Sequence, residues 1–131
     1  MFEETQMTIL MVDDDPTVCN LVARSLEQEG FRVLTANSGA EALTRWQSRR
    51  GQIDLLITDM RMPWIDGLLL ARCLAMDDPG IPVLFISGEG DTSELAEFKN
   101  SRFLAKPFSR STLLMEVNRL LKLNAAVATS E

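Results

Sequence analysis

The fold can be read outward from residues 53–67, which have the sequence IDLLITDMRMPWIDG. The first part, residues 53–58, is a nearly continuous apolar run, which is typical of a strand buried on both faces of a sheet. The run ends at an acid, Asp59, and turn-forming residues follow at 62–67. A helical pattern then continues to Leu74. This segment therefore predicts a strand, a loop that begins at a carboxylate, and a helix.

The same order of strand and helix recurs along the chain. Upstream, a strand at residues 8–12 precedes a helix capped by Asp15 with Pro16 in its first turn, and a strand at 31–36 precedes a helix capped by Ser38. Downstream, the pattern predicts strands at 82–86 and 103–105, a short helix at 92–99 and a last amphipathic helix at 109–123.

Five strands that alternate with five helices indicate right-handed βαβ crossovers and one parallel sheet covered on both faces, which is a doubly wound α/β fold. The 131 residues are enough for one hydrophobic core, so residues 1–131 are interpreted as a single domain. Its core is expected at about residues 8–123, and residues 124–131 are expected to form a flexible tail.

Composition excludes several classes of function. The net charge of −6 and a pI near 4.7 argue against a nucleic-acid surface, which needs clustered Lys and Arg. No apolar run is long enough to cross a membrane and the first residues lack the features of a secretory signal, so a cytoplasmic location is expected. The chain has no histidine, and Cys19 and Cys73 lack metal-ligand spacing. Its chemistry must therefore use carboxylates, hydroxyls and lysine.

Polar residues stand at the ends of four of the predicted strands. The first strand ends in Asp13 and Asp14, the third in Asp59, the fourth in Ser87 and the fifth in Lys106. Each feature alone is ordinary, but in a parallel sheet all of them meet at the carboxyl edge, where ligands bind. Three crowded carboxylates need a cation, and oxygen ligands favour Mg²⁺. A carboxylate nucleophile at Asp59, one metal, one lysine and one hydroxyl are sufficient for phosphoryl transfer.

Four segments together identify a family that the chain resembles. They are ILMVDDDP at 9–16, LLITDMRMPWIDG at 55–67, VLFISG at 83–88 and FLAKPF at 103–108. In order and spacing they resemble the receiver domains of two-component response regulators, over residues 8 to 123. The resemblance implies a flavodoxin-like (βα)5 three-layer sandwich whose parallel sheet has the order 2-1-3-4-5. It also implies a phosphorylation switch and not an enzyme, with slow self-dephosphorylation at most.

The resemblance also implies roles for individual residues. Asp59 accepts a phosphoryl group from a histidine kinase or a histidine phosphotransfer protein. Asp14, Asp59 and the backbone carbonyl of Arg61 bind Mg²⁺, and Asp13 acts through water. Ser87 and Lys106 contact the phosphoryl oxygens, and the Lys106-Pro107 peptide bond is cis. The switch residues are Ser87 and Phe103.

The sequence departs from the common pattern of the family at three places. Ser87 and Lys106 are about three positions closer than usual, so the fourth helix is expected to be short or distorted. Phe103 stands where Tyr is frequent, which removes a phenolic hydrogen bond. Arg61 and Glu89 flank the expected phosphate site, and we predict that they tune the lifetime of the phosphorylated state.

Two other interpretations remain open from the sequence. Asp13-x-Asp15-x-Thr17 after an apolar strand also resembles the nucleophile motif of haloacid-dehalogenase-type phosphatases, with Asp13 as the phosphorylated residue. That family needs an acidic pair after its lysine, whereas only Glu116 and Glu131 follow Lys106. Alternatively, the same fold serves as an interaction module that is not phosphorylated. The partner kinase, the stimulus and the output are not encoded in any motif of the chain.

Overall fold

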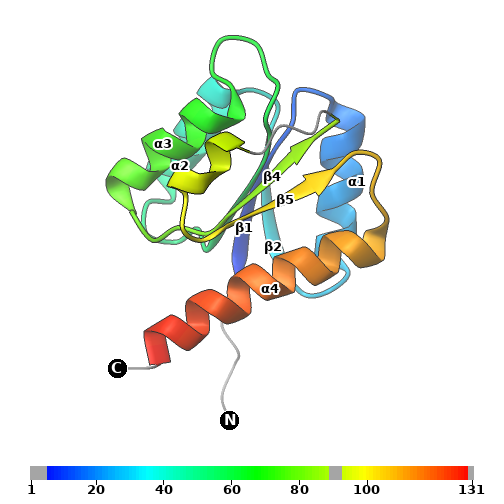
Figure 1. Cartoon of the computed structure of the whole chain (residues 1–131). Helices are drawn as coiled ribbons and strands as arrows, with labels where there is room; N and C mark the ends of the chain where they lie inside the picture. The colour runs from blue at the N-terminus through cyan, green and yellow to red at the C-terminus, as the bar shows by residue number, and fades with distance from the viewer. Residues whose placement is uncertain (1–5, 89–92, 130–131) are drawn as a thin grey trace.

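The computed structural model describes residues 6–88 and 93–129. Within these residues five strands alternate with helices (Figure 1), and all the strands are parallel. The elements in chain order are β1 (Thr8–Val12), α1 (Pro16–Glu27), β2 (Arg32–Ala36), α2 (Gly39–Ser48), β3 (Leu55–Asp59), α3 (Gly67–Asp77), β4 (Val83–Ser87), the 3-10 helix η1 (Ser93–Glu97), β5 (Ser101–Ala105) and α4 (Arg110–Thr129).

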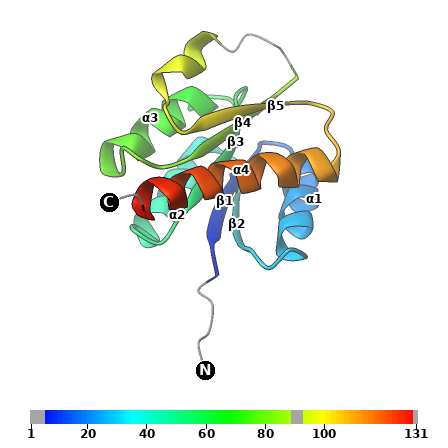
Figure 2. The same ribbon diagram turned by 60° about the horizontal axis from the view of Figure 1, so that its bottom comes forward.

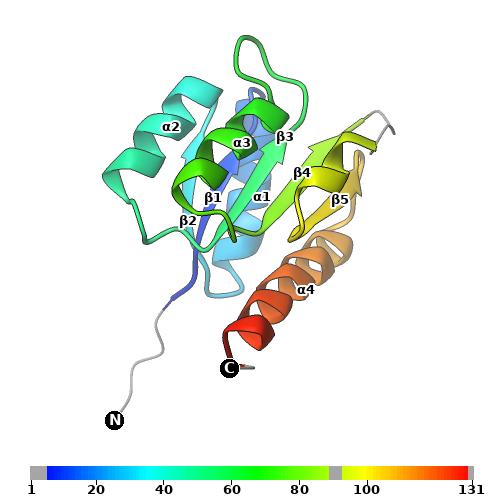
Figure 3. The same ribbon diagram turned by 60° about the vertical axis from the view of Figure 1, so that its left-hand side comes forward.

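The sheet order is β2-β1-β3-β4-β5, which confirms the predicted topology. Helices α1 and α4 cover one face of the sheet, and α2, α3 and η1 cover the other (Figures 2 and 3). Each face has its own apolar cluster, and β1, β3 and β4 are buried along their whole length. Since apolar side chains alternate between the two faces of a strand, one strand supplies both clusters. The fold is therefore a three-layer doubly wound sandwich.

Side-chain caps fix where three of the helices begin. The Asp15 side chain accepts a hydrogen bond from the Thr17 amide at 2.9 Å, and Ser38 Oγ accepts one from the Glu41 amide at 3.0 Å. Asp66 Oδ1 accepts one from the Leu69 amide at 2.9 Å at the start of α3. Such caps satisfy amides that have no partner within the helix. The two caps predicted from the sequence, at Asp15 and Ser38, are thereby confirmed.

The lengths of the last two helices can be explained from the sequence. Among the described residues the fourth helix is the short 3-10 helix η1, as the spacing predicted. The last helix continues to Thr129, so the prediction that it ends at residue 123 is wrong. Residues 124–129 read NAAVAT, and alanine is the strongest helix former, which explains the extension.

Two further predictions concern the backbone and the membrane. The Lys106-Pro107 peptide bond is cis, as expected. Among the residues that the structure describes, no helix has both the length and the apolar character that a membrane crossing requires.

Candidate functional site: an acidic pocket at the carboxyl edge of the sheet

Three carboxylates meet where β1 and β3 end. Asp13 and Asp14 follow β1, and Asp59 is the last residue of β3. One carboxylate oxygen of each residue lies within 4.8 Å of the other two. Asp13 and Asp59 are buried, whereas Asp14 is exposed. The structure thus brings together the three acids for which the sequence predicted a common site.

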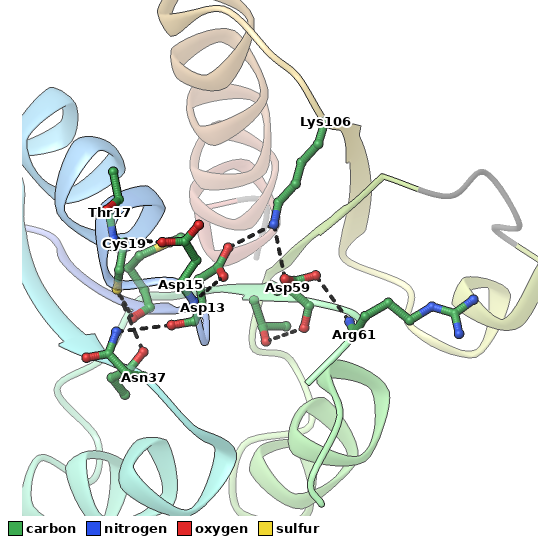
Figure 4. Close-up of polar contacts among 11 residues, drawn as sticks. Asp13, Asp15, Thr17, Cys19, Asn37, Asp59, Arg61 and Lys106 are labelled. Carbon is green, nitrogen blue, oxygen red and sulfur yellow. Dashed lines mark hydrogen bonds and ion pairs between the residues drawn. The ribbon is translucent and has the colours of Figure 1, made fainter. Parts of the chain in front are cut away.

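Lys106 enters the pocket from the end of β5. Its Nζ donates hydrogen bonds to Asp13 Oδ2 and Asp59 Oδ2, both at 3.0 Å (Figure 4). Its backbone amide donates to the carbonyl of Ser87 at 2.9 Å, which joins the ends of β4 and β5. Ser87 is buried at the end of β4, at the same edge. One ammonium group therefore connects strands β1, β3 and β5 across the pocket.

Burial and charge act in opposite directions on these groups. Burial raises the pKa of Asp13, and the nearby charge of Asp59 adds to the rise, while the Asp15 amide and Lys106 partly offset it. Burial alone lowers the pKa of Lys106, but its hydrogen bonds and ion pairs with Asp13 and Asp59 outweigh that effect and leave the pKa raised. Lys106 is accordingly a cation at neutral pH. The three acidic residues outnumber this single ammonium group.

The donor set suits a hard divalent cation. All three groups offer carboxylate oxygens, which Mg²⁺ and Ca²⁺ prefer over nitrogen or sulfur ligands. The spacing of these oxygens allows one ion to contact more than one of them. An ion at this position neutralises like charges that otherwise repel one another. The residues present therefore fit a metal site at the carboxyl edge.

The loop between β3 and α3 holds Asp59 in place. The Arg61 amide donates to Asp59 Oδ1 at 3.1 Å, so both oxygens of this carboxylate are engaged, one by Arg61 and one by Lys106. The Arg61 side chain extends away from the pocket (Figure 4). Gly67 packs directly on the backbone: a Cβ there would lie 2.9 Å from the Met60 Cα and closer still to the Asp59 carbonyl oxygen. The loop thus fixes the orientation of Asp59 from two sides.

Phe103, a predicted switch residue, lies outside the pocket. Phe103 is half-buried in β5, level with Phe85 of β4, and packs against the apolar cluster on the side of α2 and α3. Glu89 lies outside the described residues. Sequence analysis missed Asn37, whose Nδ2 donates to the Asp13 carbonyl at 3.1 Å (Figure 4). The signal that could have found it is position, because Asn37 directly follows β2 and β2 pairs with β1.

The fold and the pocket together define a class of protein. The parallel α/β sandwich of order 2-1-3-4-5 is the CheY-like fold, and the acidic pocket lies at its carboxyl edge. Residues 9–118 match the response regulator receiver domain family. The chain belongs to this family.

Individual relatives agree with this assignment. The chain is 34% identical over 126 residues to the transcriptional regulatory protein GlrR of Escherichia coli, covering 94% of this chain and 28% of that protein. It is 34% identical over 118 residues to the sensor kinase CckA of Brucella abortus, covering 88% of this chain and 12% of the kinase. The chain thus spans only a minor part of either relative.

A solved structure supports the same conclusion. The response regulator receiver protein from Sinorhizobium medicae superposes with a TM-score of 0.81 at 33% identity, covering 91% of this chain and 97% of that one. The chain is therefore a receiver domain, a type of phosphorylation switch, and not a catalytic enzyme such as a haloacid-dehalogenase-type phosphatase.

Proposed function

We propose that Asp59 accepts a phosphoryl group from a phosphohistidine on a partner protein, which is a histidine kinase or a histidine phosphotransfer protein. The observation that carries the proposal is the position of Lys106 Nζ, 3.0 Å from Asp59 Oδ2 and from Asp13 Oδ2, beside a cluster of three acids. A buried carboxylate that faces a lysine and a metal site is equipped for phosphoryl transfer.

In the transfer, an Asp59 carboxylate oxygen forms a bond to phosphorus as the phosphorus–nitrogen bond of the donor breaks. The electron pair of that bond returns to the imidazole of the donor. Lys106 exchanges its bond to Asp59 for one to a phosphoryl oxygen, while Asp13 keeps the lysine in place. The Ser87 hydroxyl contacts a second phosphoryl oxygen. The displacement of Ser87 toward this oxygen changes the position of Phe103, and the two residues form the switch.

The acids would hold Mg²⁺ in this scheme. Asp59, Asp14 and the Arg61 carbonyl are the proposed direct ligands, and Asp13 acts through water. When bound, the ion neutralises the charge of the carboxylates and of the incoming phosphoryl oxygens. The chain's own contribution is to keep Asp59 fixed through the Arg61 amide and to supply Lys106 as the second positive charge.

A groove beside Lys106 is the proposed docking surface for the donor. It has a volume of about 570 Å³ and lies between α1 and the segment that follows β5. Its walls are mainly apolar and include Val18, Leu21, Val22, Pro107, Phe108 and Leu113. Leu21 is 62% exposed, so the groove presents an apolar side chain to solvent. A donor seated here brings its histidine to the edge that carries Asp59.

The cellular setting follows from the same proposal. The free thiols Cys19 and Cys73 are typical of a reducing compartment, which supports a cytoplasmic location. The net charge of −6 supports a protein partner and neither nucleic acid nor a membrane surface.

Incubation with Mg²⁺ and a small phosphodonor, followed by intact-mass measurement and peptide mapping, tests the proposal. We expect phosphorylation at Asp59 and none in Asp59→Asn. Phosphorylation at Asp13 or none at all would contradict it, and the second result would leave an interaction module of the same fold. The same assay tests the tuning role of Arg61, because an unchanged dephosphorylation rate in Arg61→Ala would exclude that role.

A further inference from the structure

Asp13 is held at four points, and only one of them is explained by the charge of the pocket. Lys106 binds its Oδ2 at 3.0 Å, and the Asp15 amide donates to its Oδ1 at 2.9 Å. Its own amide donates to the Ala36 carbonyl at 3.1 Å, which continues the pairing of β1 with β2. The fourth contact comes from Asn37, whose Nδ2 donates to the Asp13 carbonyl at 3.1 Å. This last contact holds the peptide plane between Asp13 and Asp14.

Asn37 is itself fixed by the start of α2. Its amide donates to Glu41 Oε1 at 3.3 Å, and the Glu41 amide in turn donates to Ser38 Oγ at 3.0 Å. These bonds resemble a capping box, except that Glu41 accepts from the amide of Asn37 and not from that of the N-cap residue Ser38, and they tie Asn37 to the first turn of α2. Two residues further on, Gly39 is packed against the β3–α3 loop, where an added Cβ would lie 2.5 Å from the Ile65 Cβ. The junction of β2 and α2 therefore touches both segments that carry the acids of the pocket.

We propose that Asn37 is a positioning residue for the metal site. This proposal rests on the function proposed above. Asp14 is the exposed member of the three acids, so packing does not orient its side chain. Its direction toward Asp59 depends on the peptide plane that Asn37 holds through the Asp13 carbonyl. Loss of that bond lets the plane rotate, which separates Asp14 from the other two ligands. Asn37 contacts neither the cation nor the phosphoryl group in this role.

The chain contains a matched control. Asn100 Nδ2 donates to the Gly80 carbonyl, also at 3.1 Å, and both residues lie in the segments that lead into β4 and β5, at the opposite edge of the sheet from the acids. Asn100→Ala removes the same kind of hydrogen bond as Asn37→Ala, but far from the metal site. If such a bond has only a structural role, its loss lowers thermal stability and leaves Mg²⁺ affinity unchanged.

The test is a MgCl₂ titration of the full chain. NMR monitors it through the amide signals of Asp13, Asp14 and Asp59. We expect half-saturation at a Mg²⁺ concentration about three- to tenfold higher in Asn37→Ala, which corresponds to the loss of one hydrogen bond. Asn100→Ala should titrate like the unmodified chain. Labelling of Asp59 by a small phosphodonor is measured in parallel in all three proteins.

The outcomes separate this inference from the proposed function. An unchanged Mg²⁺ midpoint in Asn37→Ala overturns the positioning role, whether or not Asp59 is labelled. A shifted midpoint in Asn37→Ala without labelling of Asp59 in any variant supports the role of Asn37 and overturns the proposed phosphoryl transfer. If Mg²⁺ moves no signal of the unmodified chain, the metal site and the role of Asn37 are both wrong.

Discussion

The ammonium group of Lys106 lies 3.0 Å from a carboxylate oxygen of Asp59, a residue 47 positions earlier in the chain. The same nitrogen lies 3.0 Å from Asp13, so one lysine neutralises acids at the ends of two different strands. The acids are buried, and the Lys106 side chain is 28% exposed. In the proposed phosphoryl transfer, the lysine already stands close to the position of a phosphoryl oxygen and its charge. The stability of this pocket and its chemistry depend on the same three side chains.

Replacing Lys106 by methionine should destabilise the metal-free protein at neutral pH. The change leaves Asp13 and Asp59 buried side by side without their cation, and breaking a buried ion pair costs several kcal/mol. Since Lys106 is partly exposed, we expect a smaller loss, about 1–3 kcal/mol of unfolding free energy. Mg²⁺ should restore much of this loss, because the ion stabilises the folded state by binding it. Urea unfolding with and without Mg²⁺ measures both effects.

Lys99 provides the control for this substitution, since it lies away from the pocket, in the segment between η1 and β5. Lys99→Met should change the unfolding free energy by less than about 0.5 kcal/mol, with or without Mg²⁺. If Lys106→Met loses no stability in metal-free buffer, or if Mg²⁺ gives it no more stabilisation than it gives the unmodified chain, the electrostatic account of the pocket is wrong.

Gly67→Ala should displace the backbone at Asp59. The added Cβ would meet the carbonyl oxygen of Asp59 and the Cα of Met60, which are backbone atoms and cannot rotate away. We expect a loss of about 1–3 kcal/mol in unfolding free energy, the usual cost of forcing extra volume into a packed site. Gly80→Ala is the comparison, because the nearest atom to its Cβ is 4.0 Å away. Equal stability of the two variants would show that the loop yields without cost.

The sequence was sufficient to predict that the acids and Lys106 meet, and the reason is geometric. Carboxyl ends of parallel strands share one edge, so the acids at the ends of the adjacent strands β1 and β3 and the long Lys106 side chain after β5 are expected at the same edge once the topology is known. The sequence did not show that Lys106 binds Asp13 as well as Asp59, because that depends on side-chain rotamers. The contact of Asn37 with the Asp13 carbonyl was missed, although the position of Asn37 directly after β2 places it beside the residue that follows β1. The end of α4 at Thr129 could have been predicted, since alanine-rich residues favour helix.

The ion pair of Arg72 and Glu97 should add a small pH dependence to stability. Arg72 of α3 binds Glu97 of η1 through two nitrogens, with the shortest bond at 2.6 Å, and these bonds lower the pKa of Glu97 from its ordinary value of 4.5. A carboxyl group with a lowered pKa in the folded state stabilises that state above its unfolded pKa, and the effect is lost as the pH falls through the folded value.

Glu97→Gln should therefore be slightly less stable than the unmodified chain above about pH 4.5, and the difference should shrink below it. Urea unfolding of both proteins across this range gives the comparison. Because both residues are exposed, the difference should also fall at high salt. A difference that stays constant from neutral to acid pH would indicate that the substitution alters packing and not charge.

Trp64→Gly should make the protein more stable, although it removes the largest side chain of the β3–α3 loop. Trp64 has a positive φ of 69°, and the Ile65 amide donates to the Pro63 carbonyl at 2.9 Å, which together form a tight γ-turn centred on Trp64. A left-handed backbone costs a residue with a Cβ roughly 1–2 kcal/mol, and glycine avoids this cost but loses roughly 0.5–1 kcal/mol of chain entropy. The side chain is 99% exposed, so its removal forfeits little burial. We expect a net gain of about 0.5–1 kcal/mol by urea unfolding.

Trp64→Ala keeps a Cβ and should leave stability unchanged, so a loss in that variant would mean that the indole itself packs against the fold.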